Sequence, residues 1–186
     1  MRIIFIRHGK TAGNCEKRYI GKTDEPLSHE GIKELSERYY PEAEIVIISG
    51  MKRCVETAKL IYPNREYITV NGLEECDFGD FEGKNYKELS DNPDYKSWVE
   101  SGGILPFPNG ESPAGFKKRC VAAFAEAVQK FKDKSAISFV VHGGTIMAVL
   151  EKYALPKKDY FDYGVENGGG YITEFDGEII RITEKI

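Results

Sequence analysis

The sequence lacks an excess of positive charge. Its 26 lysine and arginine residues are outnumbered by 30 aspartate and glutamate residues, which gives a formal net charge of −4. Nucleic-acid-binding proteins usually carry a basic face or stripe, so the intermixed charges argue against such a partner. Any site for an anion must therefore be a local concentration of positive groups on a mildly acidic chain.

Long apolar runs are also missing. The first run, Ile3–Ile6, is short and lies between Arg2 and Arg7, and no later segment has the length that a membrane span requires. We therefore expect no signal peptide, no membrane partner and a cytoplasmic location.

Cysteine and histidine are scarce. The chain has three histidines, and its four cysteines lie far apart without a CxxC pair: Cys15, Cys54, Cys76 and Cys120. A disulfide framework or a structural zinc site needs a different spacing and context. We expect four reduced thiols, no metal and no cofactor.

The chain does contain an alternation of short apolar runs and helix signals. The runs predict strands at Ile3–Ile6, Glu44–Ile48 and Ile137–Val141, and the final segment predicts a hairpin turning on Asp176-Gly177. No linker or repeat divides the chain, so we predict one domain over residues 1–186. The predicted fold class is α/β: a mostly parallel central sheet with an antiparallel edge, flanked by helices in a three-layer sandwich.

Helices are predicted between these strands. Ser28 and Ser112 can each cap a first turn, and Pro113 suits the first helical position. A further helix is expected over Thr145–Leu155. The stretch 69–109 is richer in glycine, proline, aspartate and aromatic residues, and we expect it to form loops and short helices over the top of the sheet.

Three junctions after the strands share one form: "IIFI-RHGKT", "IVII-SGMKR" and "SFVV-HGGT". In open α/β sheets, ligands bind beyond the carboxyl ends of the strands, where a helix begins. If the three strands are neighbours, one crevice receives Arg7, His8, Arg53 and His142. Two guanidinium groups suit a dianionic phosphate, and glycines such as Gly143 let the backbone approach a ligand closely.

The ordered motifs resemble a known family. "RHGKTAGN" resembles the Arg-His-Gly-x-Thr-x-x-Asn signature of the histidine phosphatase superfamily, the phosphoglycerate-mutase-like enzymes. "RYIGKTDEPLSHEG", "SGMKRCVETA", "LEECDFGDFEG", "PNGES" and "VVHGGT" follow in the family's order, over residues 2 to about 148. A P-loop, by contrast, needs a glycine where Ile4 stands. Departures from the family's pattern at Gly50-Met51, Glu56 and Phe81 remove no charged group.

The resemblance implies a role for each matching residue. His8 would attack phosphorus and form a phosphohistidine, and Glu75 would protonate the leaving oxygen. Glu74 and Asp77 are weaker candidates for that acid. The implied phosphate ligands are Arg7, Asn14, Arg53 and His142, and the implied backbone contacts to the substrate are Gly21 and Gly143.

The leading prediction is a metal-independent phosphomonoesterase acting on a small phosphorylated metabolite. "RYIGKTDEPLS" and "FGDFEGKNYKEL" look most like the α-ribazole phosphatase branch, which implies α-ribazole 5′-phosphate, a precursor in cobalamin biosynthesis. Four aromatic residues could pack against such a substrate or form the core of a small cap: Tyr86, Tyr95, Trp98 and Phe107.

Other hypotheses remain open. A phosphoglycerate mutase shares the chemistry, but family mutases carry extra segments, and the short connection between Arg53 and Glu75 favours hydrolysis. A broad sugar-phosphate or fructose-2,6-bisphosphate phosphatase would use the same residues. A two-metal phosphoesterase is another hypothesis, with four candidate ligands: His8, His142, Glu75 and Asp77. These residues do not show the HxH or DxH spacing that such a site would favour. A sensing module would bind phosphate esters without turnover, and a homo-oligomer is left open.

Overall fold

One sheet joins strands from both ends of the chain. In the computed structural model, which describes residues 1–186, seven strands follow the order β3-β2-β4-β1-β6-β7-β5. Their bounds are β1 Arg2–Arg7, β2 Ile45–Ile48, β3 Tyr67–Thr69, β4 Ala136–Val141, β5 Ala154–Leu155, β6 Gly170–Phe175 and β7 Ile180–Lys185. Strands β1 to β4 pair in parallel, whereas β6 is antiparallel to both β1 and β7. The mostly parallel sheet and the predicted hairpin are confirmed.

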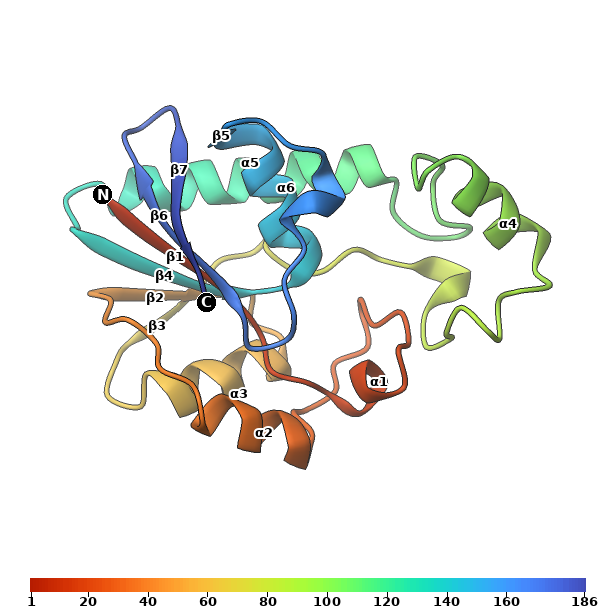
Figure 1. The fold of residues 1–186 in the computed structure, drawn as a ribbon, viewed down its shortest axis with the longest axis horizontal. Coiled ribbons are helices and arrows are strands. Elements are labelled where there is room, and N and C mark those ends of the chain that lie inside the picture. The colour runs from red at the N-terminus through yellow and green to blue at the C-terminus, as the bar shows by residue number, and fades with distance from the viewer.

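Helices cover both faces of the sheet. They are α1 Ala12–Cys15, α2 His29–Ser36, α3 Lys52–Ile61, α4 Pro93–Glu100, α5 Pro113–Lys130 and α6 Gly143–Tyr153, with short 3-10 helices η1 Gly79–Phe81 and η2 Tyr160–Tyr163. Figure 1 shows α2 and α3 on one face and α5 and α6 on the other, which gives the expected three layers. None of these helices combines the length and hydropathy that crossing a membrane requires.

The predicted helix caps are present. The Ser28 hydroxyl accepts a hydrogen bond from the Gly31 N–H at 3.0 Å, and the Ser112 hydroxyl accepts one from the Gly115 N–H at 3.1 Å. Each cap satisfies an amide that has no partner inside its own helix. Pro113 occupies the first turn of α5 as expected.

The helix predicted over Thr145–Leu155 differs at both ends. It begins at Gly143 and stops at Tyr153, because Ala154 turns to an extended backbone conformation. Ala154 then pairs with Ile180 of β7, and both residues are fully buried. The burial that this short strand gains against the sheet explains why the helix does not continue.

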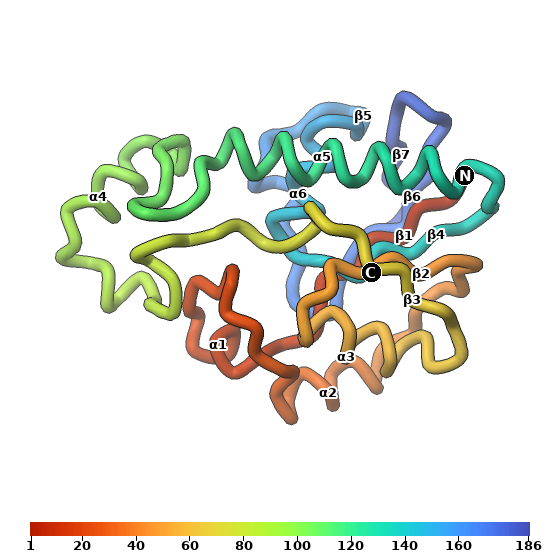
Figure 2. Tube along the Cα trace, turned by 180° about the vertical axis from the view of Figure 1, so that it is seen from behind, coloured from red at the N-terminus to blue at the C-terminus, as the bar shows by residue number.

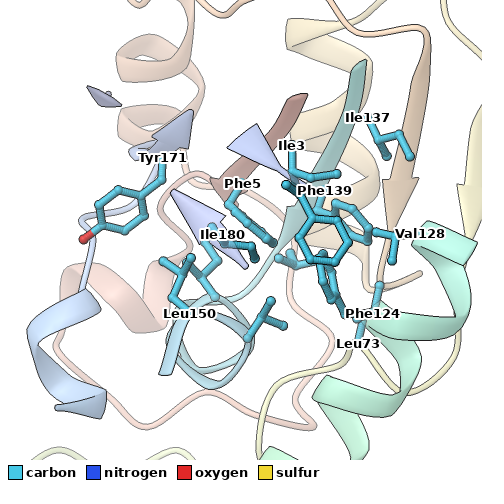
Figure 3. Close-up of a cluster of buried hydrophobic side chains, with 14 of the residues drawn as sticks. Ile3, Phe5, Leu73, Phe124, Val128, Ile137, Phe139, Leu150, Tyr171 and Ile180 are labelled. Atoms are coloured by element: carbon cyan, nitrogen blue, oxygen red, sulfur yellow. The ribbon is translucent and has the colours of Figure 1, made fainter. Parts of the chain in front are cut away.

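The two faces of β1 pack into separate cores. Successive side chains of a strand point to opposite faces, so Ile3 and Phe5 pack against α5 and α6 while Ile4 and Ile6 pack against α3. Figure 3 shows the first of these cores, in which the Phe124 ring lies 5.7 Å from that of Phe5. Burial on both faces is why the strand sequence is continuously apolar.

A third cluster forms a cap beyond the carboxyl ends of the strands. The segment 69–109, including α4, extends away from the sheet there, as both Figure 1 and Figure 2 show. Phe81 and Phe107 are buried in the cap, with Tyr95 and Trp98 packed against them. Tyr95, Trp98 and Phe107 therefore belong to the core of the cap, which is one of their two predicted roles, whereas Tyr86 is half exposed.

Candidate active site

The order of the strands in the sheet brings the three predicted junctions together, those that follow β1, β2 and β4. Strand β4 lies between β1 and β2, so the residues that follow these three strands meet at one edge. The rings of His8 and His142 have centroids 5.2 Å apart, and both side chains are buried. Arg7 ends β1, and Arg53, in the first turn of α3, is fully buried. The convergence expected from the sequence is therefore present.

The ring of His8 is fixed in one orientation by its own neighbour. Its Nδ1 lies 2.7 Å from the carbonyl oxygen of Gly9, and because a carbonyl only accepts, Nδ1 carries the proton. Burial lowers the pKa of His8 well below 6.5, and the charges of Arg53 and Arg7 lower it further. The ring is thus neutral at physiological pH, with the lone pair on Nε2.

The guanidinium of Arg53 is held by backbone carbonyls. Its Nη1 donates to the oxygen of Thr23 and its Nη2 to that of Gly21, both at 2.8 Å. The Gly21 N–H in turn donates to Glu82 at 2.8 Å. A Cβ atom at Gly21 would lie 1.9 Å from the Cys76 carbonyl oxygen, so only glycine fits. The N–H of Gly21 is used within the protein, so a predicted contact of this N–H with substrate would require the bond to Glu82 to be exchanged.

His142 is oriented chiefly by Arg53 and Ser49, and Cys54 Sγ lies 3.6 Å from its Nε2. Its Nδ1 accepts a hydrogen bond from Arg53 Nε at 3.3 Å, which leaves Nε2 to donate to the Ser49 hydroxyl at 2.8 Å. Burial lowers the pKa of His142 well below 6.5, and the nearby Arg53 charge adds to this. A direct bond from His142 to phosphate would require a change of partner. Ser49 was not predicted as a site residue, although it belongs to the "SGMKR" junction.

Arg7 presents a buried donor that no protein atom accepts. Its Nη1 donates to the carbonyl oxygen of Val165 at 2.9 Å, but its Nε–H is buried and has no partner. A Cβ atom at Gly143 would lie 3.4 Å from this nitrogen, so the start of α6 lies against the guanidinium. Buried donors are almost always satisfied. An orphaned guanidinium N–H beside a helix N-terminus is the environment of an anion.

The amide of Asn14 is also oriented for donation. Its Oδ1 accepts hydrogen bonds from the Thr11 N–H at 3.2 Å and from Asn167 Nδ2 at 3.0 Å. Asn14 can therefore direct its NH2 group to a ligand. Asn167 Nδ2 also lies 3.1 Å from the carbonyl oxygen of His8. Asn167 was not predicted, because it lies 159 positions after His8 and only the fold brings the two together.

Glu75 is one of the residues that line a cleft. Its two carboxylate oxygens accept hydrogen bonds from the N–H groups of Cys76, at 3.0 Å, and Gly144, at 3.1 Å. A Cβ atom at Gly144 would lie 2.2 Å from the carboxylate. The cleft has a volume of about 740 Å³ and extends from Glu75 between the cap and α6.

The competing carboxylates are engaged elsewhere. Glu74 accepts a hydrogen bond from the Gly72 N–H at 2.8 Å and pairs with Arg119 at 3.4 Å. Asp77 forms an ion pair with Lys22 at 2.7 Å, which lowers the pKa of the carboxyl. Of the three, only Glu75 lines the cleft.

The ligand set of the two-metal hypothesis is not assembled. Nowhere in the structure do three or more histidine, cysteine, aspartate or glutamate side chains come together in a way that could hold a metal ion. All four cysteines are free thiols.

Comparison with known proteins decides the family. The model of the histidine phosphatase superfamily (branch 1) matches residues 3–185. The chain belongs to this family. The resemblance seen in the motifs is confirmed, and so is the prediction of an enzyme of the phosphoric monoester hydrolase type.

Similar proteins differ in their activities. An acid phosphatase from Mycobacterium tuberculosis is 31% identical over 159 residues, which cover 82% of this chain and 75% of that protein. The structure of an α-ribazole phosphatase from Shigella flexneri matches with a TM-score of 0.86 at 23% identity, covering all of this chain and 96% of the other. A phosphoserine phosphatase mutant from Entamoeba histolytica, in complex with phosphoserine, matches with a TM-score of 0.83 at 26% identity, covering 99% and 95%. The shared fold is clear, and the substrate of this chain is a separate question.

Proposed function

We propose that the protein hydrolyses phosphomonoesters through a phosphohistidine intermediate on His8. The observation that carries this proposal is the bond from His8 Nδ1 to the Gly9 carbonyl. It leaves the Nε2 lone pair of a neutral ring buried beside Arg7 and Arg53. A neutral imidazole nitrogen is a nucleophile for phosphorus, and adjacent guanidinium groups stabilise the charge on the phosphoryl oxygens.

The first step transfers the phosphoryl group to the enzyme. His8 Nε2 attacks phosphorus, the N–P bond forms and the bond from phosphorus to the ester oxygen breaks. Glu75, in its protonated form, gives its proton to the leaving oxygen, and a neutral alcohol departs into the cleft that Glu75 lines. The oxygens of the transferring group are held by Arg53, the orphaned N–H of Arg7 and the free amide of Asn14.

The second step restores the enzyme. The Glu75 carboxylate takes a proton from water as the water oxygen attacks phosphorus, and the N–P bond breaks. Inorganic phosphate leaves and His8 returns to the neutral form in which Nδ1 carries the proton. His142, fixed by Ser49 and Arg53, keeps the side of the pocket next to His8 in place.

The cleft supports a substrate with an apolar alcohol part. Most of its surface comes from aromatic and aliphatic side chains, among them Phe78, Trp98, Ile104, Phe107, Phe116 and Met147. We propose α-ribazole 5′-phosphate as the best candidate, because its benzimidazole base suits such walls and because the motifs resemble that branch. Broad hydrolysis of sugar phosphates, including fructose 2,6-bisphosphate, is the second candidate.

Trapping the intermediate tests the chemistry. We expect an ester with radiolabelled phosphate to leave an acid-labile, base-stable label on the wild type and on His29→Ala, whose histidine is exposed on α2. His8→Ala should carry no such label. Turnover or labelling that survives His8→Ala would refute the proposal, and tight ester binding by the wild type without turnover would indicate a sensing module instead.

Product analysis in EDTA tests the substrate. We expect phosphate release with the highest kcat/KM for α-ribazole 5′-phosphate, compared with 3-phosphoglycerate, fructose 2,6-bisphosphate and simple nucleotides. Uniformly weak rates for all of these substrates would be compatible with the phosphohistidine mechanism but would contradict the assignment to cobalamin biosynthesis. Interconversion of phosphoglycerates without phosphate release would identify a mutase.

A further inference from the structure

The wall of the cleft carries one basic side chain, and that side chain is already paired. Among the residues that line the cleft, Lys117 of α5 is the only lysine or arginine, while Glu75, Glu151 and Asp159 are acidic. Beyond the catalytic carboxylate, the cleft therefore holds one positive and two negative groups. This balance opposes a second anionic group on a bound substrate.

The ammonium of Lys117 is held by α6 and by an aromatic ring. Its Nζ lies 2.9 Å from Glu151 Oε1 and 2.8 Å from Oε2, so the carboxylate binds it with both oxygens. The same Nζ lies 4.1 Å from the centroid of the Tyr160 ring. An ammonium group with this set of partners has little to gain from a further anion.

The pair lines the same cleft as Glu75. Tyr160 donates a hydrogen bond from its hydroxyl to the carbonyl oxygen of Gly144 at 3.3 Å, and the N–H of Gly144 holds Glu75. Lys117 and Glu151 thus lie one aromatic ring away from the residue that protonates the leaving oxygen. The alcohol part of a substrate bound in this cleft therefore shares the cleft with Lys117 and Glu151.

We propose that Glu151 is a specificity-determining residue, which neutralises Lys117 and so makes the cleft reject phosphomonoesters whose alcohol carries a carboxylate or second phosphate. This inference rests on the proposed phosphatase function. It explains how an enzyme with the phosphate pocket of this family can discriminate between neutral and anionic alcohols. The rejection comes from the acidic side chains of the cleft, outside the phosphate site. Removal of the Glu151 charge leaves Lys117 free to attract the second anion.

Two matched substrate pairs test the proposal. Glycerol 3-phosphate and 3-phosphoglycerate differ in a hydroxymethyl group against a carboxylate, and benzyl phosphate and 4-carboxybenzyl phosphate place the carboxylate farther from phosphorus. We expect the wild type to prefer the neutral member of each pair. In Glu151→Gln, the ratio of kcat/KM for the anionic member to that for the neutral member should rise about tenfold in at least one pair, which corresponds to about 1.4 kcal/mol.

Two further variants make the test specific. Lys117→Met combined with Glu151→Gln should abolish the gain, because the attracting charge is gone. Glu30→Gln breaks a surface ion pair with Lys10, away from the cleft, and should leave the ratio unchanged. An unchanged ratio in Glu151→Gln, with normal turnover of the neutral esters, would overturn the inference alone. Absence of turnover of every ester by the wild type would overturn the proposed function and the inference together.

Discussion

Glu82 and Gly21, 61 positions apart, are joined by a hydrogen bond of 2.8 Å from the Gly21 N–H to the carboxylate. The same carboxylate oxygen accepts bonds from the N–H of Thr23 at 2.9 Å and from its hydroxyl at 2.8 Å. The carbonyls of Gly21 and Thr23 hold the guanidinium of Arg53. Glu82 therefore positions Arg53, the arginine proposed to bind phosphate, through the backbone of Gly21 and Thr23.

Removal of the Glu82 side chain should weaken phosphate binding. We expect Glu82→Ala to lower kcat/KM by about 10- to 100-fold, because a displacement of about 1 Å in a positioning group has effects of that order. Inhibition by inorganic phosphate should weaken in parallel. Glu82→Gln keeps the acceptor oxygen and should remain close to the wild type. A loss of equal size in both variants would point to the charge of Glu82 rather than to the loop.

Asn167 should act through Asn14. Because Asn167 Nδ2 bonds both Asn14 Oδ1 and the His8 carbonyl, Asn167→Ala should lower kcat/KM by about tenfold. In a double-mutant cycle, Asn14→Ala and Asn167→Ala should be clearly non-additive. Asn71→Ala, an exposed asparagine, is the matched control and should have no effect. Full additivity of the two active-site variants would show that they act independently.

Much of the fold could be predicted from local patterns. Continuous apolar runs identified β1, β2 and β4, since strands buried on both faces need them. The three-residue β3 and the two-residue β5 carry no such signal, because their formation depends on a neighbouring strand already in place. The end of α6 was misplaced for the same reason.

The candidate site was predictable only where a motif names its residues. His8, Arg53 and Glu75 lie in motifs, whereas the groups that hold them are distant in sequence or belong to the backbone. Ser49 and Asn167 act by contacts that only the folded chain defines. The glycines of the motifs indicated part of the site geometry. A residue larger than glycine at position 144 would displace Glu75, for example.

Glu75→Gln should affect substrates according to their leaving groups. An acid catalyst contributes about 10²- to 10⁴-fold, and most when the leaving oxygen is strongly basic. We therefore expect a loss in kcat/KM of this order for alkyl phosphates and a much smaller loss for p-nitrophenyl phosphate, whose leaving group needs no proton. The ratio kcat/KM reports the step in which the leaving group departs, whereas kcat also includes the second step, in which Glu75 serves every ester as the base. Glu74→Gln is the matched control, because this neighbouring carboxylate bonds Gly72 and Arg119 outside the cleft. A uniform loss in kcat/KM for all esters would assign Glu75 a binding role.

The two buried histidines should make stability depend on pH. Burial lowers the pKa of His8 and His142 well below 6.5, so they stay neutral in the folded chain while the unfolded chain protonates them near 6.5. The unfolded state then binds more protons, and the free energy of unfolding falls as the pH drops below about 6.5, by up to about 1.4 kcal/mol per pH unit for each histidine. Above that pH the folded and unfolded states bind the same number of protons at these two histidines, so their contribution to the pH dependence vanishes.

Denaturant titrations between about pH 8 and pH 5 check this dependence. His142→Gln should remove one of the two contributions and give a shallower fall below about pH 6.5, whatever its effect on stability at neutral pH. His29→Gln, at the exposed histidine, should keep the slope of the wild type. Equal slopes for His142→Gln and the wild type would mean that His142 is protonated in the folded protein. A protonated ring has no lone pair to offer, so Nδ1 of His142 could not then accept the hydrogen bond from the Arg53 N–H.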